Sequence, residues 1–180
     1  MPFPTDKKPL TAEHFPPIEL LLLDVDGVLT DGAIAYTEDQ TETKVFHVKD
    51  GLGIKMLHQS GIRTGIVTGR ASPALLRRCR ELGIHMVYDN VRDKGAVFDR
   101  IMEETGLPAS AIAFMGDDLP DLPGFKKAGL SIAVADAHSV VCEQADMITE
   151  KCGGQGAVRE VCEMLLKSKG LWDSLIEQWK

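Results

Sequence analysis

Short apolar runs alternate with amphipathic segments along most of this chain. The apolar runs favour buried parallel strands, and we expect these at residues 21–23, 62–67, 84–88, 111–115, 130–134 and 147–148. Apolar residues at helical spacing predict helices between them, at residues 50–60, 73–82, 94–105, 119–128, 139–145 and 157–167. Strand and helix in regular alternation predict an α/β fold, a Rossmann-like, doubly wound parallel sheet with helices on both faces.

Three segments lie outside this alternation. Residues 1–17 are rich in proline and predict an irregular N-terminal arm, which lacks the apolar core of a secretory signal. Residues 33–48 predict a small β-hairpin insertion, with strands at 33–36 and 44–48. Residues 152–180 predict a C-terminal loop, a helix and a tail with an apolar stripe that includes Trp172 and Trp179. We find no boundary and expect one domain over residues 1–180.

Composition narrows the possible partners and compartment. The net charge of −7 argues against a nucleic-acid surface, and no apolar run is long enough to span a membrane. The four cysteines show no Cys-x-x-Cys spacing, so we expect reduced, mostly core residues and a cytoplasmic protein.

The first strand ends in two carboxylates, in the sequence Asp24-Val25-Asp26-Gly27. In an open parallel sheet, ligands bind beyond the carboxyl ends of the strands. The pair by itself admits three interpretations: it caps a turn, it holds a metal for a nucleotide-sugar transferase, or Asp24 attacks a phosphoryl group.

Other chemistry-bearing residues follow the later strands in a definite order. Thr68 ends one strand, Lys94 begins the helix after another, and Gly116-Asp117-Asp118-Leu119-Pro120-Asp121 follows a further one. Because parallel strands end at one edge of the sheet, we expect these groups to lie in one site.

This order resembles that of the haloacid dehalogenase-like phosphatases. The resemblance implies that Asp24 is the nucleophile, which forms an aspartyl-phosphate, and that Asp26 is the general acid and base. It implies that Thr68 binds the phosphoryl group and that Lys94 balances its charge. Mg²⁺ prefers oxygen ligands, so the cofactor is expected on Asp24, the main-chain carbonyl of Asp26, and Asp117. The weaker candidates Asp118 and Asp121 would serve the metal's outer shell or cap a helix.

The spacing leaves no room for a cap domain over the site. Only 35 residues lie between Gly32 and Thr68, and 23 between Arg70 and Lys94. An uncapped site takes a large substrate or is closed by another subunit, and the hairpin, whose edges need partners, is a natural oligomerisation element.

One uncapped subfamily shares longer stretches with this chain, the 3-deoxy-D-manno-octulosonate 8-phosphate phosphatases. The shared stretches are Asp24–Gly32, Phe46–Ile54, Thr68–Arg70, Gly116–Leu119 and Gly153–Glu160. The resemblance implies a Mg²⁺-dependent hydrolase of lipopolysaccharide biosynthesis and a homotetramer in which neighbouring subunits complete each site. It also implies that residues 153–156 belong to a tail that covers a neighbour's site. Substrate contacts are implied at Asp26, His47, Val48, Lys49, Asp50, Gly51, Lys55, Arg70, Arg78 and Lys94.

Two alternatives remain open at this level. The substrate could be a nine-carbon keto-sugar acid 9-phosphate, which also carries a carboxylate and a terminal phosphate. The fold could instead serve as a non-catalytic oligomerisation module of sugar-acid metabolism, although the complete set of Asp24, Asp26, Thr68, Lys94 and Asp117 speaks against that.

Overall fold

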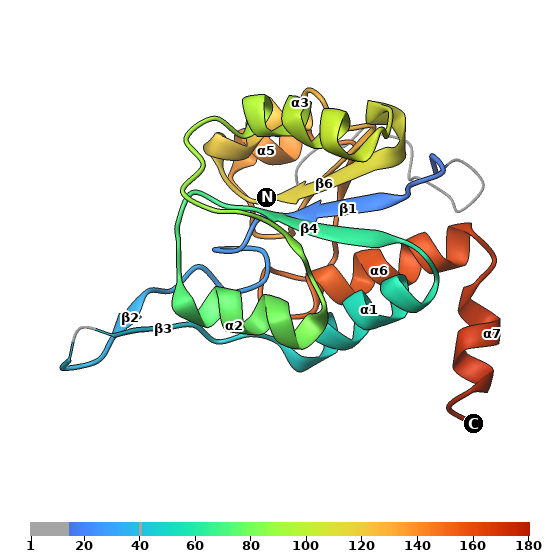
Figure 1. Ribbon diagram of the computed structural model, residues 1–180, viewed down its shortest axis with the longest axis horizontal. Helices are drawn as coiled ribbons and strands as arrows, with labels where there is room; N and C mark the ends of the chain where they lie inside the picture. Colours follow the sequence, from blue (N-terminus) through green and yellow to red (C-terminus); the bar gives the residue numbers. More distant parts are fainter. Residues whose placement is uncertain (1–14, 40) are drawn as a thin grey trace.

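The computed structural model describes residues 15–39 and 41–180, so most of the predicted N-terminal arm lies outside the described residues. One sheet of six parallel strands, in the order β5-β4-β1-β6-β7-β8, forms its centre (Figure 1). The strands are β1 (Leu20–Leu23), β4 (Arg63–Val67), β5 (Met86–Tyr88), β6 (Ile112–Gly116), β7 (Leu130–Ala133) and β8 (Met147–Ile148). The predicted doubly wound parallel sheet is confirmed.

Helices cover both faces of this sheet. The first group of helices is α1 (Val48–Gln59), α2 (Pro73–Leu82), α3 (Lys94–Thr105) and α4 (Leu122–Phe125). The later helices are α5 (Ser139–Gln144), α6 (Ala157–Ser168) and α7 (Trp172–Glu177), and two short 3₁₀ turns are η2 (Ala109–Ala111) and η3 (Leu119–Asp121). In Figure 1, α1, α2 and α6 lie on one face of the sheet, and α3 and α5 on the other. None of the helices in the described ranges has the length and hydropathy needed to cross a membrane.

Strand β1 shows how the sequence builds these two layers. Its four leucines are all fully buried. Leu21 and Leu23 join the core beneath α1, α2 and α6, whereas Leu20 and Leu22 join the core beneath α3, α4 and α5. Because side chains alternate across a strand, four consecutive apolar residues fill both layers at once. The strand therefore occupies the middle of the sheet, between β4 and β6, and delivers Asp24 to its carboxyl edge.

The hairpin differs from its predicted form. Its strands are β2 (Ala35–Tyr36) and β3 (Glu42–Thr43), and the predicted strand at 44–48 is wrong because α1 already begins at Val48. His47 takes extended backbone angles at the N-cap position of α1. Asp50 lies in the first turn of the helix, where a negative charge interacts favourably with the helix dipole. The β-branched Val45 and Val48 are instead exposed to solvent.

Residue types that favour the N-cap position precede α2 and α3, but the two caps differ in their contacts. Asp93 caps α3, and its carboxylate accepts hydrogen bonds from the main-chain N–H groups of Gly95 and Ala96. Ser72 occupies the N-cap position of α2, but its hydroxyl is buried and makes no hydrogen bond within the described part of the chain.

The C-terminal tail packs through only part of its predicted apolar stripe. The Trp172 ring lies below two cations of α6, Arg159 at 5.7 Å and Lys167 at 5.1 Å. Leu175 is buried, but Trp179, which follows the end of α7, is exposed. The stripe is expected to pack within or between subunits. Trp179 does not pack within its own chain, and its packing between subunits stays a prediction.

Candidate active site

Asp24 follows β1 directly and is buried at the carboxyl edge of the sheet. Its main-chain N–H donates to the carbonyl oxygen of Met115, which continues the β1–β6 ladder by one residue. The Lys94 Nζ lies 2.9 Å from Asp24 Oδ1. The predicted nucleophile and the predicted charge-balancing lysine are therefore in direct contact.

Lys94 reaches this position from the first turn of α3. Its ammonium also forms an ion pair with Asp121 and lies 5.7 Å from the centre of the Phe114 ring. Burial opposes the charge of Lys94, but the charges of Asp24 and Asp121 outweigh burial and raise its pKa. Lys94 thus stays protonated at neutral pH, as a phosphate-binding group requires.

Three carboxylates, those of Asp24, Asp117 and Asp121, have oxygen atoms within 4.8 Å of one another. Burial raises the pKa of Asp117 to about 8, with the charges of Asp24 and Asp121 adding to the effect. Burial also raises the pKa of Asp24 to about 6, against the opposing charge of Lys94. The cluster carries more negative charge than its one lysine neutralises. A hard divalent cation, which takes oxygen ligands, fits the residues present.

Asp121 and Asp118 have structural partners of their own. Asp121 Oδ2 accepts hydrogen bonds from the main-chain N–H groups of Asp117 at 2.8 Å and Asp118 at 3.2 Å. Asp118 caps η3, and its Oδ1 accepts from the N–H of Leu119 at 2.8 Å. Of the two weaker candidates, Asp121 thus contacts both Lys94 and the turn at Asp117 and Asp118, and Asp118 caps η3.

Two glycines allow backbone segments to approach each other in the site. Gly27 has φ +92°, and a Cβ there would overlap the Asp117 carboxylate. A Cβ on Gly153 would overlap the carbonyl oxygen of Gly27, and the N–H of Gly154 donates to Val28 at 2.9 Å. The segment that was expected to cover a neighbour's site therefore lies against the loop after β1 of its own chain.

Asp26 is held by residues from two other segments. Its Oδ1 pairs with Lys44, and its Oδ2 lies 3.6 Å from Arg70 Nε. Glu42 binds both cations, at 3.1 Å from Lys44 and 2.6 Å from Arg70. Sequence reasoning identified Asp26 and Arg70 but missed Glu42 and Lys44. The available signal was the spacing Glu42-x-Lys44, which puts two opposite charges on one face of an extended segment.

Thr68 lies at the same edge of the sheet. Leu23 of β1 pairs with Ile66 of β4, so Thr68 follows β4 just beyond the level of Asp24. The residue is buried, and its Oγ1 accepts from the N–H of Arg70 at 3.4 Å. Its main-chain N–H donates to Tyr88, which fixes the loop after β4.

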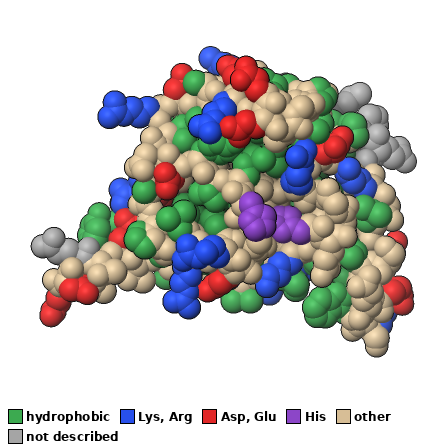
Figure 2. All heavy atoms as spheres, viewed as in Figure 1, with side chains coloured by type: hydrophobic (Ala, Val, Ile, Leu, Met, Phe, Trp, Pro, Cys, Tyr) green, Lys and Arg blue, Asp and Glu red, His purple; other side chains and the backbone are tan. Residues whose placement is uncertain are grey.

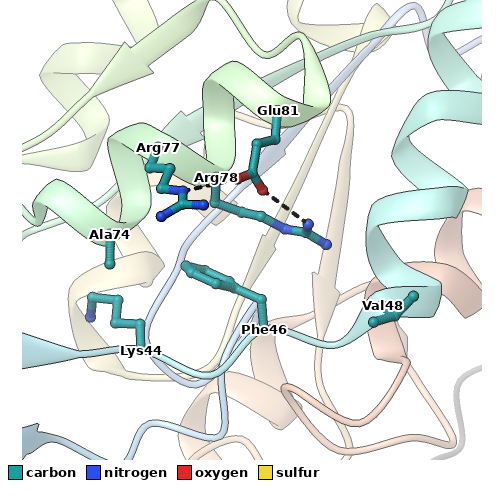
Figure 3. A pocket seen from close by; sticks show the side chains of 7 residues that line it. All are labelled: Lys44, Phe46, Val48, Ala74, Arg77, Arg78 and Glu81. Carbon is teal, nitrogen blue, oxygen red and sulfur yellow. Dashed lines mark hydrogen bonds and ion pairs between the residues drawn. The ribbon is translucent and has the colours of Figure 1, made fainter.

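The predicted sugar-acid contacts divide into two groups. Arg78 of α2 lies across the Phe46 ring, with its guanidinium carbon 5.8 Å from the ring centre (Figure 3). A Cβ on Gly51 would overlap the Arg78 guanidinium, so this glycine makes room for the arginine. A cavity of about 280 Å³ lies here, lined by Lys44, Phe46, Val48, Ala74, Arg77, Arg78 and Glu81. Lys44 connects this cavity to Asp26.

The second group lies at the start of α1. Asp50 is buried, and its Oδ1 accepts from the N–H of Arg159 at 2.8 Å. Asp50 Oδ2 and His47 Nδ1 are buried without a hydrogen-bond partner among the residues described. Lys49 and Lys55 are exposed, and neither makes a side-chain ion pair within the described ranges.

Comparisons with known proteins agree with this geometry. Residues 47–129 match the family model described as haloacid dehalogenase-like hydrolase. The chain is 44% identical over 156 residues to the 3-deoxy-D-manno-octulosonate 8-phosphate phosphatase KdsC of Escherichia coli (strain K12), covering 87% of this chain and 83% of that one. The curated relative from Haemophilus influenzae is 42% identical over 153 residues, covering 85% of each chain.

Solved structures give the same result. The phosphatase of the same name from Moraxella catarrhalis, in complex with magnesium ion, phosphate ion and a KDO molecule, superposes with a TM-score of 0.90 at 43% identity, covering 92% of this chain and 95% of that one. The cobalt-bound phosphatase from Haemophilus influenzae superposes with a TM-score of 0.85 at 40% identity, covering 88% and 92%. The chain therefore belongs to the 3-deoxy-D-manno-octulosonate 8-phosphate phosphatase family of haloacid dehalogenase-like hydrolases.

Proposed function

We propose that this chain hydrolyses 3-deoxy-D-manno-octulosonate 8-phosphate to the free sugar acid and phosphate, as a Mg²⁺-dependent step of lipopolysaccharide precursor synthesis in the cytoplasm. The contact between Lys94 and Asp24 at 2.9 Å, beside the Asp117 carboxylate, carries the proposal. It places a nucleophile, a phosphate-binding cation and candidate metal ligands at one point.

In the first step, an Asp24 oxygen attacks the phosphorus, and the bond from phosphorus to the sugar oxygen breaks. Asp26 gives its proton to that oxygen, so the sugar leaves as an alcohol. Lys94 and Thr68 neutralise and orient the phosphoryl oxygens. Asp24, Asp117 and the main-chain carbonyl of Asp26 would hold Mg²⁺, which when bound supplies positive charge to the phosphoryl oxygens.

In the second step, Asp26 is a carboxylate and acts as the base. It takes a proton from a water molecule whose oxygen attacks the phosphorus, and the bond between phosphorus and Asp24 breaks. Phosphate leaves, and both aspartates return to their starting forms.

The cations near the cavity suit the acid end of the substrate. Arg78 lies over Phe46, with Nη1 3.6 Å from Glu81. Guanidinium groups bind carboxylates through two parallel hydrogen bonds. Arg70 is the second candidate, because it already contacts carboxylate oxygens of Asp26 and Glu42. We assign the sugar body to His47, Val48, Lys49, Asp50 and Gly51 at the start of α1 and to Lys55 further along that helix. At the start of α1, two buried polar atoms have no partner within the described chain.

The hairpin supports a homotetramer whose neighbouring subunits complete each site. Ile34, Tyr36, Val45 and Val48 expose large apolar side chains in and near the hairpin, which projects from the body of the molecule (Figure 2). Large apolar side chains exposed together in one segment of the chain are typical of protein interfaces. Sedimentation analysis of the wild-type protein checks the assembly.

Two assays test the function itself. Release of phosphate from the eight-carbon 8-phosphate is compared with release from a nine-carbon keto-sugar acid 9-phosphate, with Mg²⁺ and then with EDTA. Faster turnover of the nine-carbon compound would refute the substrate assignment. An assembled wild-type protein with no phosphatase activity on either compound would favour the non-catalytic module.

A further inference from the structure

Each carboxylate oxygen of Asp26 has a cationic partner. The two partners differ in how much of the side chain is exposed to solvent. Lys44, just after β3, pairs with Oδ1, and only 3% of its side chain is exposed. Arg70, in the loop after β4, lies 3.6 Å from Oδ2, and 43% of its side chain is exposed. Asp26 is thus fixed through one oxygen and only loosely engaged through the other.

Glu42, in strand β3 of the hairpin, contacts both of these cations. Its carboxylate lies 3.1 Å from the Lys44 ammonium and 2.6 Å from Arg70 Nη2. Lys44 therefore sits between two acids, and the long lysine side chain has lost its freedom to move into solvent. A buried cation held in this way keeps a single geometry, whereas exposed pairs exchange readily with water.

We propose that Lys44 is a positioning residue for the proton-transfer step, an inference that rests on the proposed phosphatase function. Lys44 fixes Asp26 through Oδ1 and leaves Oδ2 to exchange the proton with the leaving sugar oxygen and the attacking water. Arg70 is the partner that moves: the substrate carboxylate draws it away from Asp26, and Oδ2 becomes available. The hairpin thus acts in catalysis within its own chain.

The two steps of the proposed reaction, transfer of the phosphoryl group to Asp24 and its hydrolysis by water, respond differently to a misplaced Asp26. This difference separates a positioning role of Lys44 from a general structural one. An alkyl sugar oxygen leaves only if it is protonated, whereas p-nitrophenolate is a stable leaving group that needs no proton. Attack by water needs Asp26 as base with either ester. Misplacing Asp26 therefore slows both steps for the sugar ester but only the second step for p-nitrophenyl phosphate.

The test compares Lys44→Met with wild type in rapid-mixing experiments. We expect steady-state turnover of both esters to fall about 10²-fold, the usual cost of a misplaced catalytic group. The first turnover of p-nitrophenyl phosphate should stay within about threefold of wild type, since its leaving group needs no proton. The result is a burst of one p-nitrophenolate per active site. Lys44→Arg should recover part of the steady-state rate.

Two further variants serve as controls. Lys127→Met removes an exposed lysine that pairs with Asp99, far from this site in sequence, and should leave all rates unchanged. Glu42→Gln keeps Lys44 and should show the same burst with a smaller loss, which preserves the test if Lys44→Met folds poorly.

Equal slowing of the first and later turnovers of p-nitrophenyl phosphate in Lys44→Met would overturn the proposal, as would sugar-ester turnover within twofold of wild type. Other results would refute the proposed phosphatase function itself. If wild type releases no p-nitrophenolate, or Asp24→Asn gives the same first turnover as wild type, the phosphatase assignment fails and not the role of Lys44.

Discussion

The Lys94 ammonium lies 2.9 Å from Asp24 Oδ1 and forms a second ion pair with Asp121. One cation from the start of α3 thus joins the residue after β1 to the turn after β6. All three side chains are buried, so we expect the contact to affect both turnover and stability.

Replacing Lys94 by Met should damage both properties. Two buried carboxylates lose their shared cation, and the free energy of unfolding should fall by about 3 kcal/mol. Turnover should fall by about 10³-fold, because a preorganised charge at the phosphoryl group is lost. Denaturant unfolding and steady-state kinetics check the two effects. Unchanged stability would contradict the buried ion-pair arrangement.

Asp117→Asn should separate metal binding from folding. The substitution removes a ligand, so we expect the Mg²⁺ affinity to fall at least about tenfold and turnover to be lost. In EDTA the variant should unfold about 3 °C above wild type, corresponding to about 1 kcal/mol. Asn removes the cost of burying the Asp117 charge and, secondarily, its repulsion with Asp24 and Asp121.

Asp118→Asn is the matched control for that experiment. Asp118 caps η3 and is exposed, and Asn caps helices as well as Asp. Calorimetric titration with Mg²⁺ should show wild-type affinity for this variant. Weakened Mg²⁺ binding by Asp118→Asn, together with normal binding by Asp117→Asn, would mean that Asp118 and not Asp117 is the metal ligand.

Asp50→Asn should stabilise the protein in a pH-dependent way. Burial raises the pKa of Asp50 above its ordinary value of 3.8. A carboxyl group with a raised pKa in the folded state contributes stability at low pH, and this is lost as pH rises through that pKa. Asn keeps an oxygen for the N–H of Arg159 and carries no charge. Its gain in melting temperature over wild type should therefore grow from pH 4 to pH 7, and a gain that shrinks with pH would be the opposite result.

Gly153→Ala should disturb the loop after β1, which carries Asp24 and Asp26, through steric overlap alone. The added Cβ meets the carbonyl oxygen of Gly27, and we expect a loss of about 2 kcal/mol in stability and at least about tenfold in turnover. Gly61→Ala is the control, since Gly61 has φ +77° but open space around its Cα. It should cost about 1 kcal/mol without lowering turnover. Equal turnover in both variants would show that the close contact between residues 153–154 and the loop after β1 does not matter for turnover.

Much of this architecture could be predicted because its signals are local. The apolar run of β1 is confirmed as a buried parallel strand. The cap at Asp93 follows from one residue type at one position. The meeting of Asp24, Lys94 and Asp117 followed from the rule that parallel strands end at one edge.

The remaining features depend on contacts that no local pattern encodes. Val45 and Val48 favour a strand by propensity, but the hairpin ends at Thr43, and both side chains face solvent. Lysine side chains are usually exposed. The side chain of Lys44 is buried only because Asp26 and Glu42 lie on either side of it. Asp121 could be a metal ligand or a cap until the position of Lys94 is known.

The most direct test of the central claim is where phosphate becomes attached during turnover. Wild-type protein is mixed with labelled sugar-acid phosphate and Mg²⁺, quenched in acid within the first turnover, and digested for mass spectrometry. We predict a phosphoryl group on Asp24 that disappears on longer incubation and is absent from Asp24→Asn. A phosphoryl group on another residue, or normal turnover by Asp24→Asn, would contradict the account.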